Sequence, residues 1–347
     1  MADFDMFTPA ELMAARTETM KFSQLFMKLF YPLVMTFKSK KVYLDEIPGK
    51  VGMAVYCSPR VSGKVDKTRG HLTSSFEPGY VKPKHTVDML ATLVRSAGEA
   101  PLGDLTPQER FDKLTMQNLE DEEKAIQQLE EHQAVQMALY GKYTMSGENL
   151  IEPIEVDTSR NAANHIVQAG AACWSQQDAE TYDPTHDIDS YADNSSGTID
   201  VLVMGGTAFR ELNRFKLFRE KFDTKRGSLS LAELGLKDLG RWVSIKGYYG
   251  EVMLIVTKNK FIDPADGLEK LYMPANGMLM GSLSAQGVFL YGVIQNTKAI
   301  KASMEEGERY ASQWEEGGDP ADYYTMTECS PAAVQPDTNL FVFVEVN

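Results

Sequence analysis

TPQERFDKLTMQNLEDEEKAIQQLEEHQAVQMALYG, from Thr106 to Gly141, carries a helix signal at each of its ends. Thr106 is followed by Pro107 and Glu109, a capping box with proline at the first helical position. Gly141 is placed to end the helix. After Pro107, no proline or glycine interrupts the run up to Tyr140. We therefore predict one helix about 50 Å long, which exceeds the roughly 30 Å width of a small domain.

The predicted helix is strongly acidic in its first two thirds. Between Glu109 and Glu131 it carries eight acidic and three basic side chains. A coiled coil is one interpretation, but Glu122 and Gln133 interrupt its apolar seam. A long spine lying across a sheet fits better. Its narrow apolar stripe consists of Met116, Leu119, Ile126, Leu129, Met137 and Tyr140.

A basic stretch precedes the helix. Arg60 to Lys84 contains six basic and two acidic side chains, and Leu72 is the one large apolar residue between Val65 and Phe76. Glycines and prolines punctuate the stretch, which predicts two extended limbs joined by a polar tip. A hairpin of this kind is marginal in water by itself, so we expect another structure to support it.

The N-terminal segment has an apolar face of its own. Phe22, Leu25, Phe26, Leu29 and Phe30 follow helical spacing until Pro32 ends the pattern. The face packs either on the core of its own chain or on a neighbouring subunit.

The rest of the chain predicts a mixed fold. Residues 198–204 are typical of a buried strand, and the following residues of a basic amphipathic helix. Residues 322–330 and 339–346 predict strands that pair as a C-terminal hairpin, the second covered on both faces. The fold class is α+β, with an elongated outline.

Composition limits the function. Among 347 residues, 35 are basic and 49 acidic, so the net charge is -14, which argues against wrapping nucleic acid. Three separated cysteines indicate reduced thiols. The acidic N-terminus is not that of a signal peptide, and the apolar run 22–37 is too short to span a bilayer. We expect a soluble intracellular protein.

We find no catalytic, cofactor or metal constellation in the sequence. Cys173 lacks a distant downstream histidine, so we interpret it as a buried small side chain. Gly205-Gly206 lacks the third glycine of a dinucleotide fingerprint. Asp183, His186 and the acids after them invite a metal, but the loop fails the EF-hand pattern. A helix start with acids near its positive end is the simpler interpretation. We therefore expect no enzyme.

Several motifs together resemble the lambda-like major head protein family of tailed phages, which has the Hong Kong 97-type capsid fold. The match covers nearly the full length, with the segments in the same order and spacing. It is carried by KVYLDEIPG (41–49), VSGKV (61–65), FEPGYVKPKH (76–85), MQNLEDEEKAIQQLEEHQAV (116–135), GKYTM (141–145), YDPTHDIDSYA (182–192), DTKRGS (223–228), KDLG (237–240) and GDPADYYTM (318–326).

The resemblance implies a division into parts. These are an N-terminal arm (1–41), an extended β-hairpin loop (42–87), a peripheral domain (88–151) with the spine helix 107–140, an axial domain (152–313) and a C-terminal return to the peripheral domain (314–347).

It also implies the function of a major capsid protein. Copies would form hexamers and pentamers of an icosahedral procapsid that expands as DNA enters. The implied partners are a scaffolding protein, a decoration protein, a portal protein at one vertex, and DNA enclosed without tight binding. No scaffold-like segment precedes the arm, so scaffolding should come from another chain. The protein would assemble in the host cytoplasm and end in the virion. Two alternatives stay open: an encapsulin-like compartment shell and a nucleic-acid-binding protein.

We expect subunit contacts from three regions, because the loop of one subunit should lie over the peripheral domain of the next. The residues are Phe22, Phe26 and Phe30 of the arm, Arg60, Lys64, Lys67, Arg69, Phe76 and Tyr80 of the loop, and Glu120, Asp121, Glu122 and Glu123 of the helix.

Overall fold

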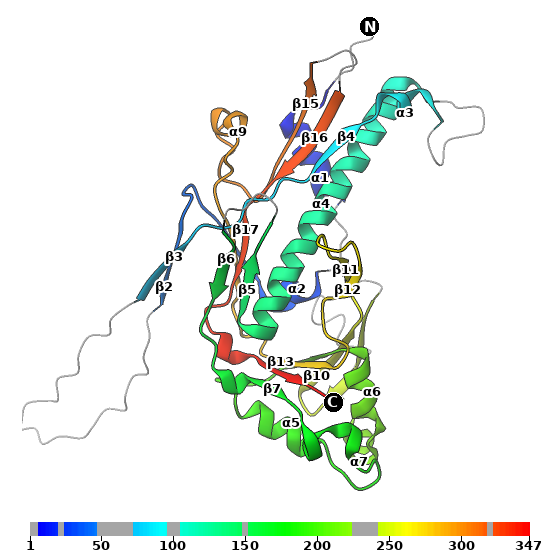
Figure 1. The fold of residues 1–347 in the computed structure, drawn as a ribbon, viewed down its shortest axis with the longest axis vertical. Helices are drawn as coiled ribbons and strands as arrows, with labels where there is room; N and C mark the ends of the chain where they lie inside the picture. Colours follow the sequence, from blue (N-terminus) through cyan, green and yellow to red (C-terminus); the bar gives the residue numbers. More distant parts are fainter. Residues whose placement is uncertain are drawn as a thin grey trace, which may run out of the picture.

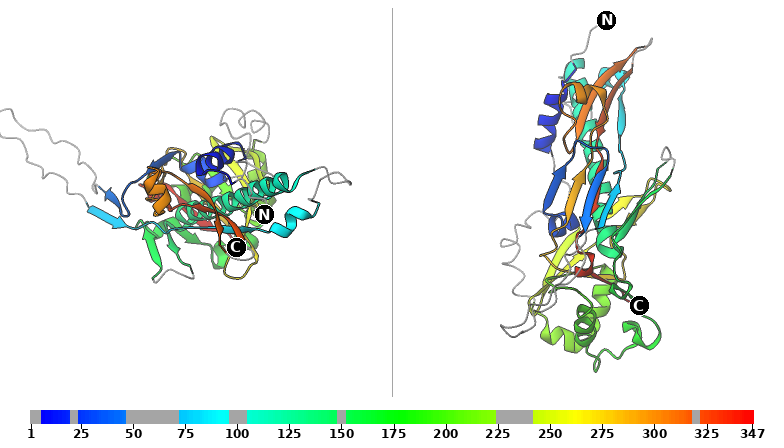
Figure 2. Two further views of the ribbon diagram at one scale, coloured as in Figure 1. Left: turned by 90° about the horizontal axis from the view of Figure 1, so that it is seen from above. Right: turned by 90° about the vertical axis from the view of Figure 1, so that its left-hand side faces the viewer.

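The computed structural model is an elongated molecule (Figure 1). It describes residues 6–19, 24–46, 72–95, 105–147, 152–223, 242–317 and 322–347. The long helix α4 (Pro107–Tyr140) runs along the upper half, and a six-stranded sheet lies at the lower end. Seen from the side, the body is narrow (Figure 2).

The predicted spine helix is confirmed as α4, and its ends lie where the sequence placed them. The Thr106 hydroxyl accepts a hydrogen bond from the Glu109 N–H, and the Glu109 carboxylate accepts one from the Thr106 N–H. At the other end Gly141 has φ +70°, the left-handed conformation that suits glycine. A Cβ on Gly141 would also lie 2.7 Å from the Cβ of Arg160.

Two three-stranded sheets continue along the upper half beside α4. In order, the first contains β15 (Tyr310–Glu316), β16 (Asp322–Glu328) and β4 (Lys84–Val87), and the second contains β1 (Leu33–Thr36), β14 (Val288–Tyr291) and β17 (Pro331–Val334). The helices of this half besides α4 are α1 (Pro9–Thr19), α2 (Leu25–Phe30), α3 (Met89–Leu93) and α9 (Thr297–Lys301).

The lower lobe is built on the six-stranded sheet. Its order is β7 (His165–Val167), β18 (Val342–Glu345), β13 (Gly277–Gly281), β8 (Val201–Met204), β10 (Val252–Thr257) and β9 (Val243–Tyr249). Helices α5 (Thr185–Ala192), α6 (Gly206–Arg214) and α7 (Lys216–Lys221) lie below it (Figure 1). Short 3-10 turns are η1 (Ala162–Asn164), η2 (Gly170–Ala172), η3 (Trp174–Gln176) and η4 (Thr338–Leu340).

Both faces of this sheet are covered. Alternate side chains of a strand point to opposite faces, so they should enter different cores. Val201 and Val203 join a core that includes α2 and the end of α4, whereas Leu202 and Met204 join a core with α6 and α7. The covering of β18 on both faces, expected from its apolar run, is confirmed.

Three hairpins complete the fold. They are β2 (Val42–Glu46) with β3 (Leu72–Phe76), β5 (Lys142–Met145) with β6 (Ile154–Asp157), and β11 (Lys260–Ile262) with β12 (Glu269–Leu271). The β2–β3 hairpin projects sideways from the body (Figures 1 and 2). Its strands form the two limbs expected for the extended loop.

The prediction of a C-terminal hairpin is wrong. β16 pairs with β15 and β4, whereas β18 pairs with β13 and β7 in the lower sheet. Sheet pairing depends on contacts between distant segments, which alternation along one strand does not specify. The strand pairing also crosses the expected boundary at residue 313, since β14 pairs with β1 and β17 in the upper half.

Arg160 fixes the junction between α4 and the lower lobe. Its guanidinium donates hydrogen bonds to three of the last carbonyls of α4, at 2.6 Å to Leu139, 2.7 Å to Ala138 and 3.4 Å to Met137. Its Nε donates to the Thr338 carbonyl at 3.0 Å. The Met137 carbonyl also accepts a hydrogen bond from the Gly141 N–H, whereas the carbonyls of Ala138 and Leu139 are among those that a helix end leaves without internal partners. Burial lowers the pKa of Arg160 to about 10, so the side chain stays charged at neutral pH.

We predict that Arg160→Ala lowers the free energy of unfolding by about 2–4 kcal/mol, because it removes the donor from the half-buried carbonyls of Ala138 and Leu139. Urea denaturation of the isolated chain measures this loss. Arg210→Ala is the matched control, since Arg210 is an exposed arginine whose hydrogen bond within the described residues goes to a nearby hydroxyl, Thr207 Oγ1. Equal losses in the two variants would contradict the role of Arg160.

Candidate functional site

The motifs that suggested chemistry have structural roles. Asp183 accepts hydrogen bonds from the N–H and hydroxyl of Thr185 at the start of α5, and its other oxygen lies 2.6 Å from Lys221 Nζ. Asp187 accepts hydrogen bonds from Trp174 Nε1 and the Tyr182 hydroxyl. Within the described ranges, no group of histidine, cysteine and acidic side chains has the arrangement of a metal site.

The turn at Gly205-Gly206 is packed against backbone rather than open to a ligand. A Cβ on Gly205 would lie 2.2 Å from the Pro274 carbonyl oxygen, so the glycine permits close contact between chain segments. Among the described helices, none is both long and apolar enough to cross a membrane.

The most unusual feature is a set of four buried carboxylates on α4. Glu123 and Glu130 lie on one side of the helix, because seven residues make nearly two turns. Glu122 and Glu131 lie on the two flanks. All four side chains are buried. Burying a carboxylate costs free energy unless hydrogen bonds and opposite charges satisfy it, so each needs a partner from another part of the chain.

Arg309 satisfies the central pair. Its Nε lies 2.9 and 3.0 Å from the two oxygens of Glu123, and its Nη2 lies 2.7 Å from Glu130 Oε2. The other oxygen of Glu130 accepts a hydrogen bond from the Tyr291 hydroxyl at 2.8 Å. The ion pairs of Arg309 hold the segment before β15 against the middle of α4, and the Tyr291 hydrogen bond holds the end of β14 there.

Glu122 binds the sheet on one flank. Its oxygens accept hydrogen bonds from the hydroxyls of Thr325 and Thr327, both at 2.7 Å, and His85 Nδ1 lies 3.3 Å away. Burial raises the pKa of Glu122, and these contacts oppose the shift. The carboxylate thereby holds β16 and β4 against the helix.

Glu131 binds the N-terminal segment on the other flank. Its two oxygens accept hydrogen bonds from the N–H groups of Phe26 and Met27, at 2.9 and 3.2 Å. These are free donors in the first turn of α2, so a carboxylate of α4 caps another helix. Complete burial raises the pKa of Glu131 to about 7, and the N–H donors only partly offset the shift.

These contacts correct two expectations about subunit contacts. Glu122 and Glu123 do not face outward, because their partners lie within the same chain. Phe26 and Phe30 are likewise buried within the chain, and the Phe30 ring meets Phe341 edge to face at 4.9 Å. The apolar face of the N-terminal segment therefore covers its own core.

The remaining predicted contact residues divide into three groups. Glu120 and Asp121 are exposed on α4, each 3.5 Å from Lys124 Nζ. Phe76 and Tyr80 are half-buried in their own chain: Phe76 packs beside Val42, and the Tyr80 hydroxyl accepts a hydrogen bond from the N–H of residue 295 at 3.0 Å. Burial raises the pKa of Tyr80. Outside the described residues lie Phe22, Arg60, Lys64, Lys67 and Arg69.

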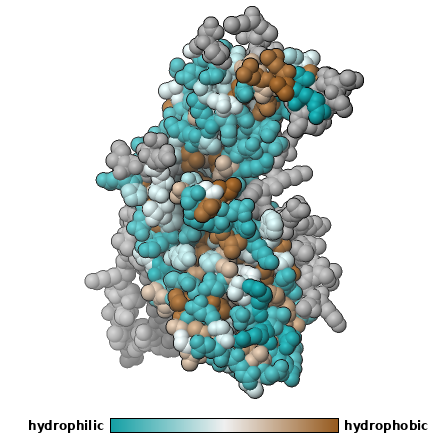
Figure 3. Space-filling model, turned by 45° about the vertical axis from the view of Figure 1, so that its right-hand side comes forward, coloured by the Kyte–Doolittle hydropathy of each residue, from teal (hydrophilic) through white to brown (hydrophobic). Residues whose placement is uncertain are grey.

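Two exposed apolar surfaces went unrecognised in the sequence. Leu90, Leu93 and Val94, on and just after α3, are 71%, 70% and 64% exposed. They belong to the apolar patch at the upper end of Figure 3. The other surface is β1, an edge strand with three exposed apolar side chains. Both lie on short elements, where the apolar periodicity that reveals a long helix is weak.

The chain matches known capsid proteins along nearly all of the sequence. The family model described as phage major capsid protein E matches residues 8–346. The major capsid protein of Escherichia phage N15 is 45% identical, and that of Escherichia phage lambda 43%, each over 98% of this chain and 99% of the relative.

Solved structures agree with this match. The putative capsid protein of a prophage of E. coli CFT073 has a TM-score of 0.82 and 35% identity, over 98% of this chain and 99% of that one. The capsid of Ralstonia phage GP4 shares the fold with a TM-score of 0.50 at 13% identity, over 94% of this chain and 92% of that one.

The raised pKa of Glu131 predicts a pH-dependent contribution to stability. Because that pKa rises from 4.5 to about 7 on folding, the folded chain binds a proton more tightly than the unfolded chain. The contribution is fully present below about pH 4.5 and is lost as the pH rises through about 7. It is on the order of 2–3 kcal/mol.

Glu131→Gln should remove this contribution, so the stability of wild type relative to the variant should decrease from pH 5 to pH 8. Urea denaturation at several pH values measures both proteins. Glu120→Gln, at an exposed position on the same helix, is the control and should follow the wild-type profile. Parallel profiles for wild type and Glu131→Gln would show that Glu131 does not titrate in this range.

Proposed function

The chain belongs to the phage major capsid protein E family, and from that premise we propose how its copies build the icosahedral shell of a tailed-phage head. The protein is a structural component of the virion. The observation that carries the proposal is the match to capsid proteins along nearly the whole chain, together with a fold that extends an arm away from its own body.

The extended loop supplies the link between copies. The described parts of β2 and β3 pair with each other, and a two-stranded hairpin is marginal alone. Val42 and Phe76 anchor its base, whereas Tyr43 is 62% exposed further out. The loop between these strands, residues 47–71, carries the basic side chains Lys64 and Lys67. It would lie across the peripheral domain of the next subunit, where Glu120 and Asp121 offer opposite charge.

The lower lobe would be the axial domain, meeting its copies at the centres of hexamers and pentamers. Following the strand pairing, we assign residues 158–281 and 341–347 to this domain. The upper half, with α4 and its two three-stranded sheets, would be the peripheral domain. The N-terminal arm would pack on its own α4 through Glu131, rather than on a neighbour.

The assembly of a phage head implies further protein partners. We propose that a scaffolding protein directs assembly of a procapsid in the host cytoplasm, that a portal protein occupies one vertex, and that the shell expands as DNA enters. A decoration protein would then bind the outside. The net charge of -14 suits a wall that encloses DNA without binding it tightly. Catalysis has no part in this proposal.

Assembly is the direct test. We predict that the chain, produced together with its scaffolding protein, forms closed particles visible by negative-stain electron microscopy. The same chain without scaffold should give fewer or irregular particles. A uniform small monomer in the presence of scaffold would contradict the proposed function.

A charge exchange tests the position of the loop. Lys64→Glu with Lys67→Glu should lower particle yield, because each exposed ion pair contributes only ~0.2–1 kcal/mol but several act together. Adding Glu120→Lys and Asp121→Lys to the same chain should partly restore the yield. Glu123 is left unchanged, since its partner is Arg309.

Added salt provides the check on this exchange. Both the loss and the rescue should shrink at high ionic strength, because salt screens exposed charges. A loss of yield with no rescue at low salt would show that the basic loop contacts another surface.

A further inference from the structure

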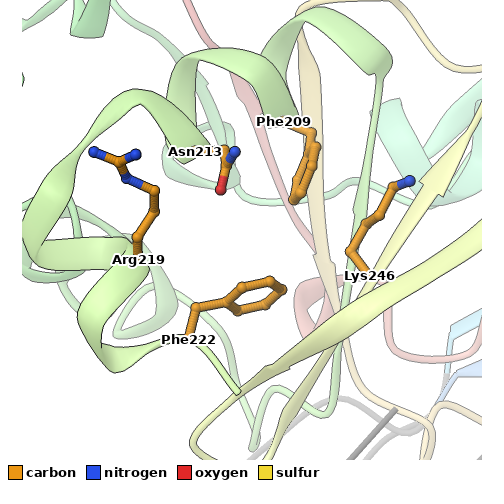
Figure 4. A pocket seen from close by; sticks show the side chains of 5 residues that line it. All are labelled: Phe209, Asn213, Arg219, Phe222 and Lys246. Carbon is orange, nitrogen blue, oxygen red and sulfur yellow. The ribbon is translucent and has the colours of Figure 1, made fainter. Parts of the chain in front are cut away.

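A cavity in the lower lobe is lined by two positively charged side chains. It has a volume of about 400 Å³ and is lined by Phe209 and Asn213 of α6, Arg219 of α7, Phe222 just after α7, and Lys246 of β9. The five side chains surround a common opening (Figure 4). Within the described part of the chain, neither Arg219 nor Lys246 is paired with a carboxylate. Two unpaired cations around one cavity favour an anion inside it.

The backbone directs Lys246 into this position. In the antiparallel pair of β9 and β10, Gly247 lies opposite Leu254 and Ile245 lies opposite Ile255, so Lys246 is the extra residue of a β-bulge. A bulge turns a side chain away from the regular alternation of a strand. The Lys246 amine consequently lies 5.8 Å from the centre of the Phe209 ring, at the cavity.

Neighbouring residues hold the aromatic wall. Phe222 stacks on buried Phe218 with ring centres 5.2 Å apart, and residue 223 exchanges two backbone hydrogen bonds with Tyr248, both 2.9 Å. A Cβ on Gly247 would lie 2.8 Å from Phe222 Cζ and 2.4 Å from the carbonyl oxygen of residue 223. Glycine therefore allows the Phe222 ring to pack against the bulge, and this contact holds the aromatic wall of the cavity in place.

We propose that this cavity is a subunit contact that takes an acidic side chain of a second copy of the chain. Arg219 and Lys246 would give the carboxylate charge-assisted hydrogen bonds, the Asn213 amide would add a donor, and the two phenylalanine rings would cover its apolar stem. The proposal rests on the proposed function, in which lower lobes meet around the axes of hexamers and pentamers.

Two observations favour a neighbouring copy over nucleic acid. Each copy has 49 acidic against 35 basic side chains, so copies carry carboxylates that their own bases do not match. A shell also holds its copies at high effective concentration. Nucleic acid binds instead through many phosphate contacts along a surface, whereas this cavity offers two cations around one space. The net charge of -14 further opposes a DNA strand.

Carbodiimide cross-linking tests the contact directly, because it joins a lysine amine to a touching carboxylate without a spacer. Shells are assembled from mixed ¹⁴N and ¹⁵N chains, treated with the reagent, digested and analysed by mass spectrometry. We expect Lys246 joined to an aspartate or glutamate peptide, with labelled and unlabelled peptides in one product. Cross-links of Lys246 confined to a single chain, or none at Lys246, would overturn the proposal.

Charge reversal is the second test. Arg219→Glu with Lys246→Glu should lower shell yield about tenfold, while the melting temperature of the isolated chain stays unchanged. Lys298→Glu with Lys301→Glu, two exposed cations on α9, is the control with the same change in charge. Wild-type yield from the cavity variant, or the same defect in both variants, would overturn the proposal.

A binding measurement separates this contact from a nucleic-acid site. Isothermal titration of the isolated chain with a short single-stranded oligonucleotide should give no binding that depends on Arg219 and Lys246. Binding that the double variant abolishes would assign the cavity to nucleic acid and overturn the contact between copies. Failure of the wild-type chain to form shells would instead count against the proposed function, and the parallel wild-type assembly shows it.

Discussion

Four carboxylates buried along one helix impose the constraint on which the rest of the subunit depends. The four are Glu122, Glu123, Glu130 and Glu131, and they are buried on three sides of α4. Burial of each carboxylate is compatible with a stable fold only if hydrogen-bond donors lie in fixed positions around it. Arg309, the threonine hydroxyls of β16 and the first N–H groups of α2 supply them. The sheet, the segment before β15 and the N-terminal segment are therefore placed by polar contacts as well as by apolar packing.

This internal arrangement determines what is left for other copies. The N-terminal segment and the two three-stranded sheets satisfy the helix within one chain. Among the described residues, the surfaces without an internal partner are the projecting β2–β3 hairpin, the apolar patch at α3, the edge strand β1 and the cationic cavity near Lys246. They lie on different parts of an elongated molecule, as a subunit with many neighbours requires. A closed shell uses repeated contacts between unlike surfaces of identical chains.

The sequence predicts those features whose causes are local. The ends of α4 follow from the capping box at Thr106 and from Gly141, and the strand at residues 201–204 follows from a short apolar run. The burial of Glu122 and Glu123 could not be predicted this way, because a run of acids ordinarily indicates a solvated face and Arg309 is remote in sequence. The sequence does contain one indication of this burial, the repeat of paired glutamates at 122–123 and 130–131. A spacing of eight residues places both pairs on the side of α4 that packs against the rest of the chain. The partners of β16 and β18, and the bulge at Lys246, likewise depend on distant strands.

A cryo-electron microscopy map of particles assembled with scaffold would show whether each subunit is complete around its own α4 and places its loop on a neighbour. We expect a closed icosahedral shell in which α2 stays on the α4 of its own chain, while the loop carrying Lys64 and Lys67 crosses onto the next subunit near Glu120 and Asp121. A map in which α2 packs on another subunit, or in which the loop folds back over its own body, would contradict this expectation.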